Sequence, residues 1–524
     1  MKKRSINRFF HWNHWNFFNY FIRMGKIKYI FLTYLIITFT ISILLYFPIT
    51  HATKNPSYNY SDALFIAASA FSDTGLSTVT VSEQYNIFGQ TVIAIAIIIG
   101  GFGFFTIKLY IFELILSRFG IKMSSHKVSV TQLERGSTVT GDTKKLIKVS
   151  LTTLIITILV GSFVLFFYFF FSNQGFFLDE TNPQKQPNDV ITFFPYQSQI
   201  YNPHGDWKLS LRYAFFHSIS AVNNAGFDII GGNSINLYYK SKGLQLILIA
   251  LFFIGGVGYP TIYDVYKKIV ALFRRQRNRV SLFTKLNLTT WLVVSVLGII
   301  LTIIFETTSG SSKTFWMQKE YGSTWDKLFA IFFNTLSTRS AGFSTVDYYS
   351  FTQPTQIIHA ILMFIGFAPA STAGGIRNLT LSIIFISVFS VIKGRKNVVA
   401  FSRQIGKETL IKAINIFIIG LSLIFIGTLI VSTSAKLSPE EIVLNDGTTK
   451  IYGMTQVFFE VCSAFGSSGL SAGITDSLNL ASKITLIFLM FIGQLGITST
   501  ILVWGRQKSK ELRISNIRED VSLG

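Results

Sequence analysis

Four short segments of the sequence share a pattern in which backbone oxygens could bind a cation. They read SAFSDTGLS (69–77), SAVNNAGFD (220–228), STRSAGFST (337–345) and SAFGSSGLS (463–471). The segments align on Gly75, Gly226, Gly342 and Gly469, with a small or polar residue before the glycine and Leu or Phe after it. Glycine lets a ligand approach the backbone closely. Four such loops around one axis could replace the hydration shell of a monovalent cation with carbonyl oxygens.

A single copy of this pattern has a simpler explanation, which is a glycine in a close interface between packed helices. The four copies, however, lie in register, each between two long apolar stretches. An internal repeat of this kind indicates one architecture built from four similar units. The repeat therefore favours a shared cation selectivity filter over four unrelated packing glycines.

The segments that must position these loops are long and apolar. Hydrophobic residues make up 49% of the 524 residues, and charged residues only 14%. About 20 apolar residues are needed to cross a membrane as a helix. Eight candidate spans are centred within 29–49, 90–115, 148–171, 243–266, 287–305, 355–391, 410–433 and 481–504. The sequence predicts an all-α membrane protein, with eight transmembrane helices as four tandem helix–re-entrant loop–helix repeats around a pseudo-fourfold pore.

The repeats divide the chain into six expected segments. A basic, aromatic-rich arm at 1–27 suits a helix lying at the membrane interface. The repeats themselves are expected at 28–118, 146–268, 284–392 and 408–506, followed by a tail at 507–524.

The net charge of +22 is distributed as in a membrane protein. Basic residues gather in the N-terminal arm and after each even-numbered span, near 118–127, 267–279, 393–396 and 506–513. This is the positive-inside pattern, which places both termini in the cytoplasm and the glycine loops on the outer side. The same segments suit anionic membrane lipids. We therefore expect a multi-pass protein of the cell membrane that binds no nucleic acid.

Catalytic patterns do not stand out in the sequence. It contains no HExxH motif, no Walker motif and no glycine–serine elbow, and no acid, base and nucleophile set on facing spans. The lone Cys462 excludes an internal disulfide and a cysteine-based metal cluster. Its alternatives are packing and a redox-sensitive thiol beside the pore. We expect no enzyme, and no cofactor.

The sixth apolar span is interrupted in its middle. Pro369 lies within a run of small residues, and proline removes a backbone donor while glycine weakens a helix. The small residues are Gly366, Ala368, Ala370, Ser371, Thr372, Ala373, Gly374 and Gly375. The helix should open here, either as a functional loop or as a kink packed on a neighbouring helix.

With these motifs the chain resembles the Trk/Ktr/HKT superfamily of potassium transporters, and most closely its bacterial Ktr-type membrane subunit. The resemblance covers roughly 28–506 and rests on the four glycine loops and on the segments that follow them. These segments are IIIGGFGFFT (97–106), FFIGGVGYPT (252–261), FIGFAPASTAGGIR (364–377) and FIGQLGITST (491–500).

The resemblance implies the residues of the site. Potassium would bind backbone carbonyls of Asp73, Thr74, Gly75, Leu76, Asn224, Ala225, Gly226, Phe227, Ser340, Ala341, Gly342, Phe343, Ser467, Ser468, Gly469 and Leu470. An intramembrane gate beneath the filter would comprise Gly366, Ala370, Ser371, Thr372, Ala373, Gly374, Gly375, Arg377 and Gln494. Glycine rather than serine at the first filter position, Gly75, implies a preference for potassium.

The sequence departs from the family pattern at two positions. Asp73 stands where an uncharged residue is usual. Its carboxylate could attract cations, or could point backwards and accept hydrogen bonds from the re-entrant helix. Gln494 stands where many relatives have a positive residue facing the gate. Arg339, which matches the family, is expected to anchor its loop through hydrogen bonds.

Other ionisable residues in apolar segments have local roles in our interpretation. His217 and His359 are expected to be packing residues, and Glu460 a local cap. Glu113 and Asp264 should meet basic clusters near the cytoplasmic ends.

The resemblance implies a pore-forming subunit for potassium uptake. It also implies a homodimer and a separate cytosolic nucleotide-binding regulatory ring that docks on the basic loops. The alternative is a sodium-coupled or weakly selective monovalent cation transporter on the same fold.

Overall fold

A computed structural model of the protein describes most of the apolar chain. The described residues are 26–52, 58–115, 125–134, 143–172, 202–231, 234–311, 314–395, 397–434, 442–443, 449–450, 453–497 and 500. The interfacial helix predicted in the N-terminal arm and the tail predicted at 507–524 lie outside these residues.

Helices dominate the described chain and fall into four units of similar order. The first unit contains α2 (Lys26–Tyr46), α3 (Tyr60–Phe71), α5 (Ile87–Phe102) and α6 (Phe104–Ile115). The second contains α8 (Thr143–Phe171), α10 (Trp207–Val222), α11 (Lys242–Gly256) and α12 (Tyr259–Phe273). The third contains α13 (Leu282–Thr308), α14 (Thr324–Ser337), α15 (Gln353–Ile365) and α16 (Asn378–Ile392), and the fourth α17 (Lys407–Ser434), α18 (Met454–Gly466) and α19 (Leu480–Leu495).

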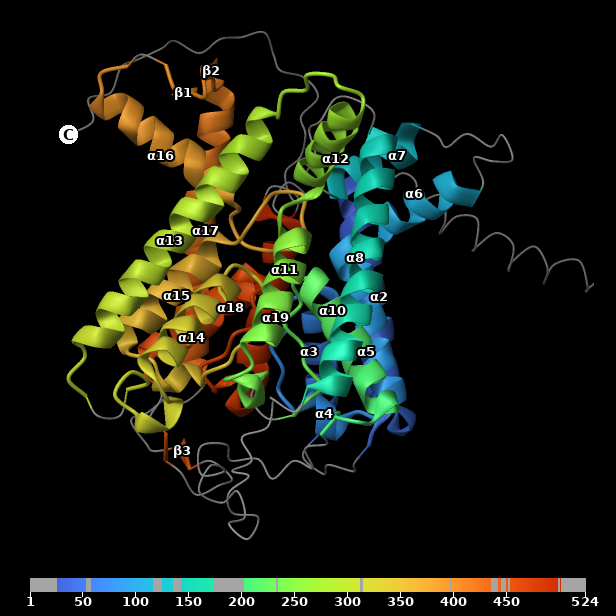
Figure 1. Cartoon of the computed structure of the whole chain (residues 1–524), viewed down its shortest axis with the longest axis vertical. Helices are drawn as coiled ribbons and strands as arrows, with labels where there is room; N and C mark the ends of the chain where they lie inside the picture. Colours follow the sequence, from blue (N-terminus) through green and yellow to red (C-terminus); the bar gives the residue numbers. More distant parts are fainter. Residues whose placement is uncertain are drawn as a thin grey trace, which may run out of the picture.

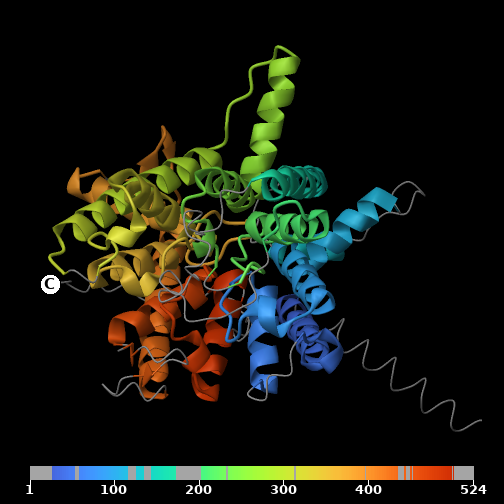
Figure 2. The ribbon, with the colours of Figure 1, turned by 60° about the horizontal axis from the view of Figure 1, so that its bottom comes forward.

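Each unit thus begins with a long helix (α2, α8, α13 or α17), continues with a short helix (α3, α10, α14 or α18) and then has a closing helix (α5, α11, α15 or α19). In the first three units a further helix, α6, α12 or α16, follows the closing helix. Figure 1 shows the long helices α8, α13 and α17 running through much of the molecule, with α12 and α16 toward one end and α4 and β3 toward the other. Figure 2 shows the units following one another around a common centre, from blue through green and yellow to red.

The remaining elements are short. They are α4 (Val81–Gln84) and α7 (Ser125–Glu134), the one-turn helices η1 (Pro48–Thr50), η3 (Asn236–Tyr238), η4 (Lys319–Tyr321), η5 (Tyr348–Ser350) and η6 (Thr475–Ser477), and two hairpins. In the hairpins β1 (Val399–Ala400) pairs antiparallel with β2 (Arg403–Gln404), and β3 (Ile442–Val443) with β4 (Thr449–Lys450).

By length and composition, the four long helices can each cross a membrane. There are also two bent helix pairs, α5 with α6 and α11 with α12, with bends of 84° and 99°. If each bent pair counts as one span, the described residues contain six candidate spans. The two other predicted spans do not meet this test among the described residues. The segment 355–391 is divided between α15 and α16, and α19 ends at Leu495. The chain is a mostly helical membrane protein, and the count of eight spans stays a prediction.

The short helices begin with side chains that satisfy their first backbone amides. Asp206 Oδ1 accepts from the Lys208 and Leu209 amides at the start of α10 (2.9 and 3.2 Å). Ser323 and Asp326 form a reciprocal capping box at the start of α14. Such caps stabilise a helix start by about 1 kcal/mol each. They fix where each short helix enters the molecule, and therefore where it ends.

Three of the four closing helices pack directly on the end of their short helix. A Cβ atom at Gly100, Gly255 or Gly493 would lie 2.7–2.8 Å from the carbonyl carbon of Phe71, Val222 or Phe465. Shortly afterwards the backbone turns at Gly103, Gly258 and Gly496, with φ of 79°, 84° and 86°. These positions need glycine, because a side chain would collide or strain the backbone.

The third closing helix differs from the others. A Cβ atom at the corresponding Gly366 would meet the carbonyl of Gly374, not the end of its short helix. The helix ends at Ile365 and a new one begins at Asn378. The interruption predicted around Pro369 is therefore confirmed, and we call the segment 366–377 the linker.

Candidate ion-binding site

The four glycine loops adopt the same uncommon backbone conformation. Positive φ angles occur at Asp73, Asn224, Ser340 and Ser467 (49°, 56°, 74° and 45°) and again two residues later at Gly75, Gly226, Gly342 and Gly469 (91°, 66°, 78° and 84°). Non-glycine residues rarely occupy this region. Its occurrence at matching positions indicates that the four loops share one geometry.

The four glycines lie side by side in a closed circle. A Cβ atom on Gly75 would lie 3.1 Å from Gly226 Cα, and one on Gly226 would lie 2.8 Å from Gly342 Cα. A Cβ on Gly342 would overlap the carbonyl oxygen of Ser468, and one on Gly469 would lie 2.9 Å from Gly75 Cα. We call these residues the glycine ring. A side chain at any of them would collide with the backbone of a neighbouring loop.

Carbonyl oxygens border the glycine ring. Those of Thr74, Ala225 and Ser468 each lie against the glycine of an adjoining loop. The amides of the same residues donate to Ser69 O, Ser220 O and Ser463 O (2.8, 2.8 and 3.0 Å), in the short helix that precedes each loop. The amides thus turn toward the short helices, while oxygens lie at the ring. This arrangement can coordinate a dehydrated cation.

The linker lies against two of the loops and the start of α12. The carboxamide of Asn224, in the second loop, hydrogen-bonds the Thr372 hydroxyl (2.7 Å). A Cβ atom on Gly374 would lie 2.6 Å from Ser467 Cβ, in the fourth loop. The carbonyl of Ala370 accepts from the amide of Tyr259 (2.9 Å), at the start of α12. The gate residues predicted from the linker are therefore brought next to the glycine loops.

Gln494 connects the linker to the first loop. Its Nε2 donates to Asp73 Oδ2 (3.0 Å) and to the carbonyl of Thr372 (3.3 Å). Arg377, at the end of the linker, donates to the carbonyl of Gln494 (2.9 Å). The contact between Asp73 and Gln494, the two departures from the family pattern, was not foreseen, because the residues lie at opposite ends of the chain.

Arg339 is fully buried next to the third loop. Its Nη2 donates to Asn378 Oδ1 at the start of α16, and Asn378 Nδ2 in turn donates to Asn287 Oδ1 on α13 (3.3 Å). A charge this close to a cation site is costly unless it is engaged. The bond to Asn378 is an anchor of the kind that the sequence predicted.

The other ionisable groups have the local partners that we expected. Glu113 pairs with Lys144 (2.9 Å), and Asp264 with Lys267 (2.8 Å). Glu460 accepts from the Thr475 hydroxyl and the Ala472 amide.

The two histidines also have local partners. His217 Nδ1 bonds Tyr213 O (2.7 Å), and His359 Nε2 bonds Thr302 Oγ1 (3.0 Å). Both histidines and Cys462 are fully buried, which supports packing roles for all three.

A feature that the sequence analysis missed is a set of contacts between consecutive units, which we call seams. In each seam a side chain near the start of a closing helix bonds the short helix of the next unit. The pairs are Gln90 with Arg212, Lys242 with Asp326, Gln356 with Gln456, and Lys483 with Asp62. The last pair closes the circle between the fourth unit and the first. A signal was present for three of the seams, since Gln90, Gln356 and Lys483 occupy corresponding positions before Gly100, Gly366 and Gly493. In the second unit this position is Gln245, which bonds its own unit, and Lys242 forms the seam.

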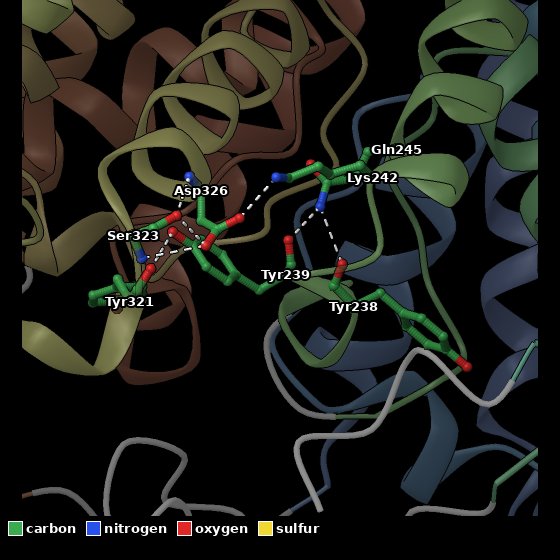
Figure 3. A network of polar contacts seen from close by, with 7 residues as sticks. All are labelled: Tyr238, Tyr239, Lys242, Gln245, Tyr321, Ser323 and Asp326. Carbon is green, nitrogen blue, oxygen red and sulfur yellow. Dashed lines mark hydrogen bonds and ion pairs between the residues drawn. The ribbon is translucent and has the colours of Figure 1, made fainter.

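Figure 3 shows the seam between the second and third units. Lys242 Nζ lies 2.8 Å from Asp326 Oδ1, and Tyr239 donates its hydroxyl to Tyr321 O (3.0 Å). Gln245 Nε2 donates to the carbonyls of Tyr238 and Tyr239 (3.1 and 2.7 Å). Hydrogen bonds from Lys242 and Ser323 hold the pKa of the Asp326 carboxyl below its ordinary value. The seam fixes the start of α14 relative to α11.

Comparison with known proteins agrees with this geometry. A family model described as TrkH, cation transport protein, matches residues 24–511. An uncharacterized cation transporter of Mycoplasma genitalium is 35% identical over 512 residues, covering 90% of this chain and 89% of that protein. The Ktr system potassium uptake protein B of Bacillus subtilis is 30% identical over 472 residues, covering 90% and 91%. The crystal structure of the potassium transporter TrkH from Vibrio parahaemolyticus has the same fold, with a TM-score of 0.61 at 14% identity over 92% of this chain and 86% of that one.

Proposed function

The chain belongs to the TrkH family of cation transport proteins, a family of transporters and not of enzymes, and from that premise we propose that it is the pore-forming membrane subunit of a potassium uptake system. The observation that carries this proposal is the glycine ring. Four loops, widely separated in sequence, place their glycines against one another in the same backbone conformation. A binding module or a scaffold would not require this arrangement.

In the proposed mechanism the loops form a selectivity filter. A potassium ion that enters the filter loses its bound water. The backbone carbonyl oxygens of the loop residues predicted from the sequence replace this hydration shell. Glycine at all four ring positions keeps the ring wide enough for a large monovalent ion. The interior-negative membrane potential drives the ion inward with about 2.3 kcal/mol per 100 mV.

The four units would be four helix–re-entrant loop–helix repeats, giving eight spans in the cell membrane. In this arrangement the ends of α12 and α16, which lead into basic segments, face the cytoplasm together with both termini. The capped starts of the short helices then face outward, and their ends point to the filter.

The linker would act as the gate. Thr372 of the linker contacts the second loop, and Gly374 contacts the fourth loop. Gln494 bonds both the linker and the first loop. Conduction would require the linker to leave this position. Arg377 would limit its movement by holding its far end to α19.

The partners follow from the family resemblance. We propose a homodimer of this subunit and a cytosolic nucleotide-binding ring as its regulator. The chain itself has no Walker motif and no nucleotide-binding glycine fingerprint, so such control would come from another protein. The basic segments after α12 and α16 offer an acidic partner a docking surface.

A second candidate is a sodium-coupled or weakly selective monovalent cation transporter on the same fold. The observation that favours it is the carboxylate of Asp73, at the first strained position of the first loop. A charged group there would attract cations, but it would discriminate less between cations of different size than a ring of carbonyl oxygens does.

The test is growth and ion uptake in bacteria that lack their own potassium uptake systems. The chain, alone and with a cytosolic partner, should restore growth at low potassium. Gly75→Ser and Gly342→Ser should lose rescue or shift uptake toward sodium, because a side chain enters the ring. The matched control is Gly394→Ser, since Gly394 also has a positive φ (62°), but a Cβ atom there would have no described residue within 4 Å. Good membrane expression without potassium or sodium flux would refute the proposal.

A further inference from the structure

Side-chain oxygens from two loops meet at one point on α5. A Cβ atom on Gly101 would lie 2.8 Å from Asp73 Oδ2 and 2.8 Å from the Asn223 carboxamide carbon. Asp73 belongs to the first loop, and Asn223 ends the short helix before the second loop. The absence of a side chain at Gly101 lets these two groups approach each other.

Gln494 adds a third group from α19. Its Nε2 donates to Asp73 Oδ2 (3.0 Å), which places the carboxamide group of Gln494 beside the carboxylate. Three different units therefore supply a carboxylate and two carboxamide groups to one cluster.

Two of these oxygens have unmet bonding capacity. Within the described part of the chain, neither Asn223 Oδ1 nor Gln494 Oε1 accepts a hydrogen bond. Asn223 is fully buried, so bulk water does not compensate its oxygen. A buried acceptor without a donor costs about 1–3 kcal/mol and calls for an explanation such as an ion or a water. Because a carboxylate lies beside them, a positively charged occupant suits these oxygens best.

The cluster lies between the glycine ring and the linker. Asp73 lies two residues before the ring residue Gly75, and Gln494 Nε2 also reaches the Thr372 carbonyl (3.3 Å) in the linker. In the proposed transport path, an ion that leaves the ring toward the linker would pass this cluster first.

We propose that Asp73, Asn223 and Gln494 form a binding subsite for a monovalent alkali cation between the glycine ring and the linker. The inference rests on the proposed function and extends it from backbone carbonyls to side chains. One carboxylate with neutral amide oxygens suits a hard, singly charged ion. A divalent ion such as Ca²⁺ takes six to eight oxygen ligands, usually with several carboxylates.

The experiment measures tracer rubidium uptake into liposomes containing the purified full chain, over a range of external potassium at a fixed membrane potential. Asp73→Asn removes the charge and should raise the half-saturating potassium concentration about tenfold. Asn223→Ala removes one neutral oxygen and should raise it about threefold. The second variant keeps the test informative if the first one does not fold. Potassium over sodium preference should stay unchanged in both, since the glycine ring is intact.

Two variants serve as controls. Asp73→Glu keeps the carboxylate and should retain most of the affinity. Glu306→Gln neutralises another fully buried carboxyl group, which accepts from Thr352 and Thr355 at the start of α15. It should leave the half-saturating concentration as in the wild type.

The outcomes separate this inference from the proposed function. If the wild type carries potassium and Asp73→Asn and Asn223→Ala have the same half-saturating concentration as the wild type, the cluster holds water and the subsite is refuted. If the wild type carries no cation at all, the proposed function fails as well. A rise for both subsite variants, with Glu306→Gln unchanged, supports the subsite.

Discussion

At the scale of single residues, each glycine loop holds a strained position as well as a glycine. Asp73, Asn224, Ser340 and Ser467 have positive φ angles, which cost about 1–3 kcal/mol in residues that carry a side chain. Such strain persists only where the surroundings enforce it. Gln494 engages Asp73, Thr372 engages Asn224, and Ser340 Oγ donates to Gly466 O (3.0 Å). The neighbours that hold the strain are thus the linker, α19 and the next loop.

The glycines of the closing helices give a prediction about stability. Gly255→Ala should lower the free energy of unfolding by about 3 kcal/mol, because its Cβ would overlap the Val222 carbonyl at the end of α10. The measurement is the apparent Tm of the purified protein in detergent. Gly243→Ala is the control on the same helix, since its Cβ would meet only the flexible ring of Tyr168, at 3.1 Å. Equal melting temperatures for the two variants would contradict this packing.

At the scale of elements, the linker distinguishes the third closing helix from the other three. The sequence predicted its interruption, because proline and glycine act on the local backbone. It did not predict where the linker would lie. That position depends on contacts such as Thr372 with Asn224 and Gln494 with Asp73, whose partners are 148 and 421 residues apart. Local propensities carry no information about such pairs.

The contact of the linker with the second loop gives a prediction about gating. Thr372→Val removes the hydroxyl that bonds Asn224 while keeping the size of the side chain. The loss of one buried hydrogen bond, about 1 kcal/mol, should favour displacement of the linker and raise the maximal uptake rate about fivefold. Potassium over sodium preference should not change.

Thr428→Val is the control for this effect. Thr428 is buried, and its hydroxyl donates to the carbonyl of Ile424 in the same helix (2.8 Å). Its uptake rate should equal that of the wild type. A Thr372→Val protein with a wild-type or lower rate would contradict the role of the linker as a gate.

At the scale of the whole molecule, the seams hold the four units in a circle. Two seams use ion pairs and two use hydrogen bonds to a neutral amide oxygen, at similar places in each unit. The pair of Lys483 and Asp62 is buried and closes the circle between residues 421 apart. Removing one member of a buried ion pair leaves an uncompensated charge, which typically costs 3–5 kcal/mol.

The seams give a prediction about assembly of the circle. Lys483→Met should lower the apparent Tm and abolish potassium uptake, because Asp62 then stays buried without its cation. The double variant Asp62→Gln, Lys483→Gln should recover both, since it reproduces the amide pair of Gln356 and Gln456. If the double variant is no better than the single one, the seams are not interchangeable and the similarity of the units is only superficial.

The sequence predicted the helical membrane class, the four loops and the interruption at Pro369, because apolar length and glycine spacing act locally. The closed ring required the structure. Glycine spacing along the chain says that four loops exist, but not that Gly469 lies against Gly75. The predicted number of eight spans exceeds what helix length supports among the described residues, because α15, α16 and α19 are each too short to cross a membrane alone.

The central claim is that the glycine ring selects potassium. The most direct measurement is rubidium uptake into liposomes containing the purified chain, with potassium or sodium as the competing ion. We predict that potassium competes far more strongly than sodium in the wild type and in Gly394→Ser, and that Gly75→Ser loses this difference. Equal competition by the two ions in the wild type, or a Gly75→Ser protein that still prefers potassium, would contradict the claim.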